Sequence, residues 1–255
     1  MTGDEAFLIA DLSILTLIGL AIGAFFCSFV VGLSAIGGGL LMAVIIEPVL
    51  GIEAVVPVIS VYLLISNVAR VVIYRESINW RKVLPILIPL VPAVALGAKV
   101  YLALEPGIIA LILGTILIIS VPIRRIMAEK EFEIGNKGML CVGAGFGFYS
   151  GTALGGGIIL IPVLLGAGVF GPALIATDAV VSIVVNVTRT AMFGWHDALG
   201  LQLLLVGTIL GIVSFPCIWA SRWIMGRTSI RVHTIAMEIL MIGAGFYFLW
   251  KAYSG

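Results

Sequence analysis

The chain has 255 residues, of which 62% are hydrophobic and 11% charged, and its formal net charge is +1. A soluble domain carries about 25% charged residues, so the composition excludes a domain folded in water, and no basic surface for nucleic acid is evident. Apolar runs of about 18 residues or more recur along the chain, each long enough to cross roughly 30 Å of hydrocarbon. The sequence therefore predicts an all-α polytopic membrane protein.

Ten apolar segments are predicted in chain order: 7–35, 39–50, 54–74, 82–104, 107–127, 138–153, 157–168, 172–193, 199–221 and 232–252. The second and seventh have about 12 residues, too few to span a bilayer as straight helices. A charged stretch, residues 124–138, divides the chain into halves of similar length. We expect a first transmembrane repeat at 1–127, a cytoplasmic linker at 128–137 and a second repeat at 138–255.

The two halves resemble each other in sequence. GLSAIGGGLL (32–41) recurs as SGTALGGGII (150–159), a shift of 118 residues from Gly37 to Gly155. NVAR (67–70) recurs as NVTR (186–189), a shift of 119 residues from Asn67 to Asn186. Two spaced matches in the same order indicate an internal duplication.

The basic residues predict how the two copies are oriented. Ten of the fourteen fall in three loops, which the positive-inside rule places in the cytoplasm: Arg75, Arg81, Lys82; Arg124, Arg125, Lys130, Lys137; and Arg222, Arg227, Arg231. Each half then crosses the membrane a net odd number of times, so the second copy is inverted. We expect both termini on the non-cytoplasmic side of the inner (plasma) membrane. Inverted repeats are typical of secondary transporters, whose site lies near the midplane.

The glycines of both copies join a long segment to a short one. A helix broken there at membrane depth would point the N-terminus of the short half-helix, with its partial positive charge, at the gap. Two such breaks from inverted copies predict an anion site made largely of backbone. The residues assigned to it are Ser34, Gly37, Gly38, Gly39, Thr152, Gly155, Gly156 and Gly157. The alternative is close packing of helices through small residues.

The stretches GLSAIGGGLLMAVIIEPVLG and GTALGGGIILIPVLLGAGV resemble the paired signatures of the sulfite exporter TauE/SafE family. Pro162 matches a proline of the signature, whereas the first copy has Val44 there; Asn79 in SINW stands where the family usually has Asp. The resemblance implies transport of small sulfur-containing anions such as sulfite, thiosulfate or organosulfonates.

Polar residues inside apolar segments are functional candidates by default. Arg70 and Arg189 can bind an oxyanion with two donors, or they extend toward the interface. Asn67 and Asn186, one turn deeper on the same faces, either line a pathway or bond between helices. Asp178 has no acidic counterpart in the first copy, where Ile59 aligns; it is a candidate carrier of a coupling proton, or it pairs with a basic residue.

Other function classes have weaker support. An intramembrane enzyme with Ser34 as nucleophile needs a base within hydrogen-bond reach, and His233 is the nearest option by depth. A non-transporting assembly subunit would not need duplicated helix breaks. No metal or cofactor is expected: the three cysteines lack metal-ligand spacing, and no GxxxxGK[ST] motif for ATP occurs. An ion or substrate gradient would therefore supply the energy, and the expected partners are a small anion and the lipid bilayer.

Overall fold

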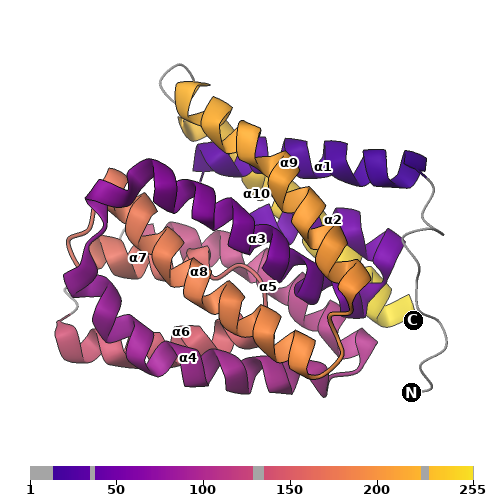
Figure 1. Ribbon diagram of the computed structural model, residues 1–255, viewed down its shortest axis with the longest axis horizontal. Coiled ribbons are helices and arrows are strands. Elements are labelled where there is room, and N and C mark those ends of the chain that lie inside the picture. The colour runs from indigo at the N-terminus through magenta and orange to yellow at the C-terminus, as the bar shows by residue number, and fades with distance from the viewer. Residues whose placement is uncertain (1–13, 35–37, 129–134, 225–229, 255) are drawn as a thin grey trace.

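The computed structural model describes residues 14–34, 38–128, 135–224 and 230–254, and this part of the chain is helical. Figure 1 shows the helices gathered in one bundle. In chain order they are α1 (Ile14–Ser34), α2 (Gly38–Leu50), α3 (Ile52–Tyr74), the 3₁₀ turn η2 (Arg75–Ser77), α4 (Trp80–Leu102), α5 (Pro106–Ala128), α6 (Asn136–Thr152), α7 (Gly157–Gly166), α8 (Pro172–Trp195), α9 (Leu201–Ile224) and α10 (Ile230–Ser254). The predicted all-α class is confirmed.

The predicted alternation of long and short helices is also confirmed. Within the described residues, four helical stretches are long and apolar enough to cross a membrane: 52–77, 80–102, 106–123 and 172–195. By contrast α2 has 13 residues and α7 has 10, which at 1.5 Å per residue is about 20 Å and about 15 Å. Both short helices follow a glycine segment, as expected.

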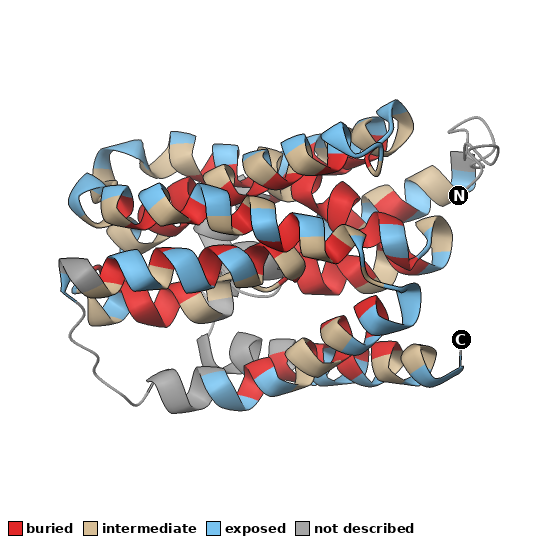
Figure 2. Cartoon of the chain, turned by 90° about the horizontal axis from the view of Figure 1, so that it is seen from below, coloured by how far each residue is buried: buried red, intermediate tan, exposed pale blue. Residues whose placement is uncertain are grey.

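The outer surface of the bundle is apolar. Figure 2 shows buried residues between the helices and exposed residues on their outward faces. Many exposed side chains are large and hydrophobic, among them Leu15, Ile88, Leu201, Ile239 and Phe246. An apolar surface of this extent would aggregate in water, so we interpret it as the surface that contacts lipid.

The helices pack across the boundary between the halves. Under the shift of 118–119 residues, α1 corresponds to α6, α3 to α8 and α4 to α9. The contact between α4 and α6 therefore corresponds to the contact between α9 and α1. Likewise, the contact between α3 and α9 corresponds to the contact between α8 and α4. Two counterpart pairs, α3 with α8 and α5 with α10, contact each other directly. Inversion of the whole repeats stays a prediction.

Glycines bring α6 unusually close to α4. A Cβ at Gly147 would lie 2.8 Å from the Leu90 carbonyl oxygen, and Cβ atoms at Gly143 and Gly151 would overlap the carbonyl oxygens of Ile86 and Val94. The spacing of four residues places these three glycines on one helix face. Small residues at such intervals allow two membrane helices to touch backbone to backbone.

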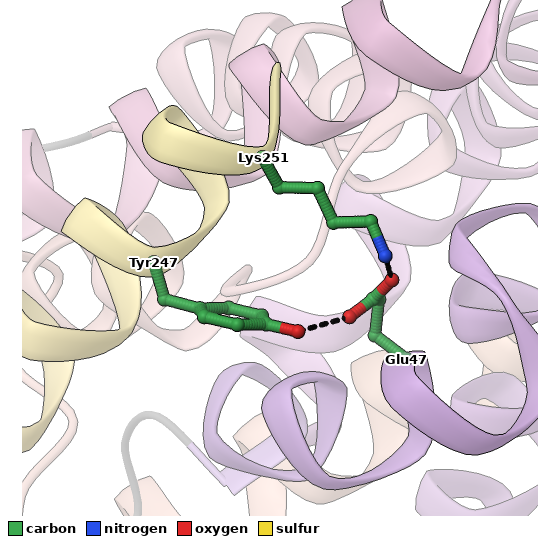
Figure 3. Close-up of polar contacts among 3 residues, drawn as sticks. All are labelled: Glu47, Tyr247 and Lys251. Carbon is green, nitrogen blue, oxygen red and sulfur yellow. Dashed lines mark hydrogen bonds and ion pairs between the residues drawn. The ribbon is translucent and has the colours of Figure 1, made fainter. Parts of the chain in front are cut away.

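A buried polar cluster joins α2 to α10. The Glu47 carboxylate, whose side chain is fully buried, accepts hydrogen bonds from the Tyr247 hydroxyl and the Lys251 ammonium group. Figure 3 shows both donors reaching Glu47 from α10. Because a buried carboxylate without partners is costly, this cluster holds the end of α2 that precedes Gly51 against α10.

The close contact of α4 with α6 generates a stability prediction. We expect Gly143→Ala to destabilise the protein by about 1–3 kcal/mol, because its Cβ meets backbone that cannot move aside. Gly145→Ala is the matched control two residues away, since a Cβ there meets nothing within 4 Å and alanine favours helix by about 1 kcal/mol. Thermal unfolding in detergent measures the difference; equal melting temperatures for both variants would contradict this packing.

Candidate functional site

A cavity of about 80 Å³ lies where α3, α8, α6 and the start of α7 meet. The first half contributes Gly39, Asn67 and Arg70 to its lining, and the second contributes Gly155, Gly156, Gly157, Asp178, Asn186 and Arg189. Residues that the sequence assigns to a site are therefore gathered around one cavity, although the outermost of them, Gly39 and Arg189, are 150 positions apart in the chain.

The cavity follows the contact between α3 and α8. Arg70, near the end of α3, has its Nη1 atom 3.9 Å from Oδ2 of Asp178, near the start of α8. The two helices therefore run antiparallel. Arg189 lies eleven residues beyond Asp178 on the same helix, about 16 Å farther along its axis. The two arginines thus flank the cavity from opposite ends.

Neither arginine extends to the surface. Arg70 is 7% exposed and Arg189 is 3% exposed, so the alternative of extension to the membrane interface does not hold in this structure. The Arg189 Nη2 atom donates a hydrogen bond of 2.6 Å to the Ala153 carbonyl oxygen. Ala153 directly follows α6, where helix carbonyls lack partners within their own helix. The helix break therefore supplies the acceptor that holds Arg189.

The break between α6 and α7 depends on one glycine conformation. Gly155 has a φ of 91°, a backbone conformation that disfavours residues with a Cβ. The chain then enters α7, and both its N-cap residue, Gly156, and its first residue, Gly157, line the cavity. The first N–H groups of a helix have no partner within it and carry partial positive charge. Backbone donors and two guanidinium groups thus surround the same space.

Unmet hydrogen-bonding capacity is concentrated at this cavity. Buried side-chain atoms without a hydrogen-bond partner in the described part of the chain include Ser150 Oγ, Asp178 Oδ1, Asn186 Oδ1 and Arg189 Nε, and all four residues line the cavity. Buried polar atoms are usually satisfied, and exceptions call for a functional explanation. A bound polar ligand would provide these partners.

Four residues that the sequence assigns to the site are not among the described cavity lining. Thr152 is not among the lining residues; its hydroxyl donates to the Phe148 and Tyr149 carbonyl oxygens of its own helix. Ser34 ends α1 and Gly38 begins α2. The Ser34 hydroxyl and the whole of Gly37 lie outside the described residues.

Two lining serines were not found from the sequence. Ser150 stands two residues before Thr152, and Ser182 is one helical turn before Asn186, whose Nδ2 donates to the Ser182 carbonyl oxygen. The signal for Ser182 was available: 178, 182, 186 and 189 recur at helical spacing on one face of α8. Helical periodicity in α6 would identify Ser150 as a lining residue only if the helix that faces this side of α6 were already known.

The lining includes pairs of residues that the sequence repeat relates, together with residues that have no counterpart in the lining, among them Asp178. Gly39 corresponds to Gly157, Leu63 to Ser182, and the Asn-Val-x-Arg residues to each other. Asp178 corresponds to Ile59, which does not line the cavity. The charged side chains of the lining are therefore two arginines at corresponding positions of the sequence repeat and one carboxylate without an acidic counterpart.

Comparison with known proteins identifies a family for this chain. The family model described as sulfite exporter TauE/SafE matches residues 20–248. No match was found among curated proteins or among solved structures. The matched range covers both glycine segments and all of the cavity lining. The chain therefore belongs to the sulfite exporter TauE/SafE family of membrane transport proteins.

Proposed function

We propose that the chain is a secondary transporter that binds a small sulfur-containing anion in the cavity between α3 and α8. The observation that supports this most directly is the meeting of two buried arginines and a helix N-terminus at one cavity with unpartnered polar atoms. Guanidinium groups and backbone N–H groups are the donors that oxyanions prefer. Coupling to protons at Asp178 is part of this proposal.

The cavity volume favours the smaller members of the substrate class. A cavity of about 80 Å³ is well below the roughly 300–1,000 Å³ of pockets that bind drug-sized ligands, so it suits a compact anion of a few non-hydrogen atoms. Sulfite and thiosulfate are of this size, whereas an organosulfonate adds a carbon chain. We therefore propose sulfite and thiosulfate ahead of organosulfonates. Uptake of the three radiolabelled anions into proteoliposomes tests both the function and this order, and no uptake of any of them would contradict the proposal.

The arginines generate the first functional prediction. Arg70→Gln and Arg189→Gln should each weaken anion binding by about tenfold or more, since a hydrogen bond to a charged group contributes about 1.5–3 kcal/mol. Replacing both arginines with Lys should retain part of the affinity, because charge remains while the two-donor geometry is lost. Calorimetry with the full chain in detergent measures the affinity.

Lys99→Gln is the control for these variants. Lys99 lies exposed on α4 and is not part of the cavity lining, so its loss changes the total charge equally without touching the site. Normal affinity in both Gln variants, with the Lys99 variant unchanged, would mean that the arginines only hold helices together.

A substitution at Gly156 tests whether the anion binds in this cavity. A Cβ there would lie 2.9 Å from Ser150 Oγ and 3.0 Å from the Phe146 ring, and both residues line the cavity. We expect Gly156→Ala to fold but to bind the anion at least tenfold more weakly, a loss of about 1.4 kcal/mol. Gly145→Ala, in open space on α6, should bind normally. Equal ligand-induced thermal shifts in the two variants would remove the cavity from the proposal.

The proposed orientation places η2 in the cytoplasm, with the α4–α5 turn and the C-terminus outside. Single cysteines at Ser77, Glu105 and Ser254, in a background without Cys27, Cys141 and Cys217, test it in intact cells. A membrane-impermeant maleimide should label positions 105 and 254 and leave position 77 unlabelled until the cells are opened. Labelling at 77 alone would reverse the orientation, and labelling of all three would refute the crossing by α4.

A further inference from the structure

Asp178 is the one carboxylate among the described residues that line the cavity, and it has no counterpart in the other half. The side chains of Asp178 and Arg70 are only 6% and 9% exposed. Their ion pair is long, at 3.9 Å between Nη1 and Oδ2, and the other oxygen, Oδ1, has no hydrogen-bond partner. The carboxylate is thus buried at the cavity and only partly neutralised.

An anion and an ionised Asp178 make competing demands on Arg70. A carboxylate that shares a buried site with a second anion is disfavoured by like-charge repulsion. A buried carboxylate with incomplete pairing is also costly in itself. Both costs disappear when a proton binds Asp178, and the guanidinium group of Arg70 is then free to bind the anion.

We propose that Asp178 and the substrate anion compete for Arg70, so that one proton binds to Asp178 when the anion binds in the cavity. This inference rests on the proposed function and specifies its coupling. A proton from water on the side to which the cavity opens forms the O–H bond on a carboxylate oxygen, and the ion pair with Arg70 breaks. Anion and proton then move in the same direction, as cotransport rather than exchange.

The charge balance of the cavity sets which anion fits. With Asp178 ionised, the cavity carries one net positive charge from Arg70, Arg189 and Asp178. With Asp178 neutral, it carries two, which match a dianion such as thiosulfate. Protonation therefore converts a site suited to a monoanion into one suited to a dianion.

Other charged groups near α8 are separate from the cavity. Arg75 and Glu76 on η2, and Arg81, Lys82 and Lys99 on α4, are exposed or half-buried and do not line it. On α6, the Tyr149 hydroxyl donates to the Leu154 carbonyl oxygen, and the α7 sequence contains no titratable side chain. On α8 itself, Arg189 is held by Ala153. Arg70 on α3 is therefore the charged partner that protonation of Asp178 releases.

The test measures thiosulfate binding to the full chain in detergent at pH values of about 5.5 and about 8, where linkage converts proton uptake into a change of affinity. Thiosulfate stays a dianion over this range, so its own protonation contributes nothing. We expect the wild-type affinity to rise about tenfold on acidification. Asp178→Asn, which mimics the neutral carboxyl, should bind tightly at both pH values. Glu76→Gln, the loss of an exposed carboxylate on η2, should keep the wild-type pH dependence.

A second measurement needs no variant. Adding thiosulfate to weakly buffered wild-type protein should take up protons, which a pH-indicator dye detects, because coupling between two ligands is reciprocal. Thiosulfate binding without proton uptake, or pH dependence that persists in Asp178→Asn, would overturn this inference and leave the anion site standing. Absence of binding by sulfite and thiosulfate to wild type at either pH would instead refute the proposed function.

Discussion

The burial of two arginine side chains along the contact between α3 and α8 is the constraint on which the cavity depends. A guanidinium group removed from water requires nearby acceptors. Arg70 has the Asp178 carboxylate and Arg189 has the Ala153 carbonyl oxygen. The acceptor for Arg189 is available only because α6 ends at Thr152, which leaves the carbonyl groups at this helix end without partners within the helix. The same break begins α7 at the cavity and presents N–H groups to it. One interruption of a helix thus provides an acceptor for a fixed cation and donors for a bound anion.

The packing of α4 against α6 determines where that interruption lies. The glycines on the α4-facing side of α6 allow backbone contact with α4, and Gly97 on α4 meets Gly151 just before the break. Since α4 also packs on α8, close approach of α6 to α4 brings the end of α6 within reach of Arg189. Larger residues on this face would separate Ala153 from Arg189, and the guanidinium group would lose its acceptor. Gly155 in the break after α6 therefore serves a conformational purpose. Gly143, Gly147 and Gly151 on α6 serve a steric one.

Sequence reasoning found the features that the two halves share and missed those that depend on contacts between helices. The helix breaks, the short helices and the paired Asn and Arg residues are repeated, so each copy strengthened the interpretation of the other. Thr152 was assigned to the cavity because it aligns with Ser34, but a hydroxyl near the end of a helix readily bonds the carbonyls three and four residues back. Ser150 was missed because its place at the cavity depends on the rotation of α6. The pairing of Arg70 with Asp178 requires the antiparallel register of α3 on α8, which no local pattern encodes.

Two buried carboxylates that have no acidic counterpart, Asp178 and Glu47, distinguish the two halves of the chain. Asp178 aligns with Ile59, and Glu47 of α2 aligns with Leu165 of α7. Glu47 holds its short helix to α10 through Tyr247 and Lys251, and an apolar Leu165 side chain cannot make such a bond on α7. Under the inverted-repeat prediction, identical halves would favour conformations open to either side of the membrane equally. The bond between α2 and α10 and, under the proposed coupling, a titrating carboxylate on α8 would break this equality at different places. Restraint of one short helix would favour one conformation at every pH, whereas under the proposed coupling the charge on Asp178 would change with the proton concentration on the side to which the cavity opens. Under the proposed coupling, the proton gradient sets the direction of net transport, while the bond that restrains α2 changes only how the conformations are populated.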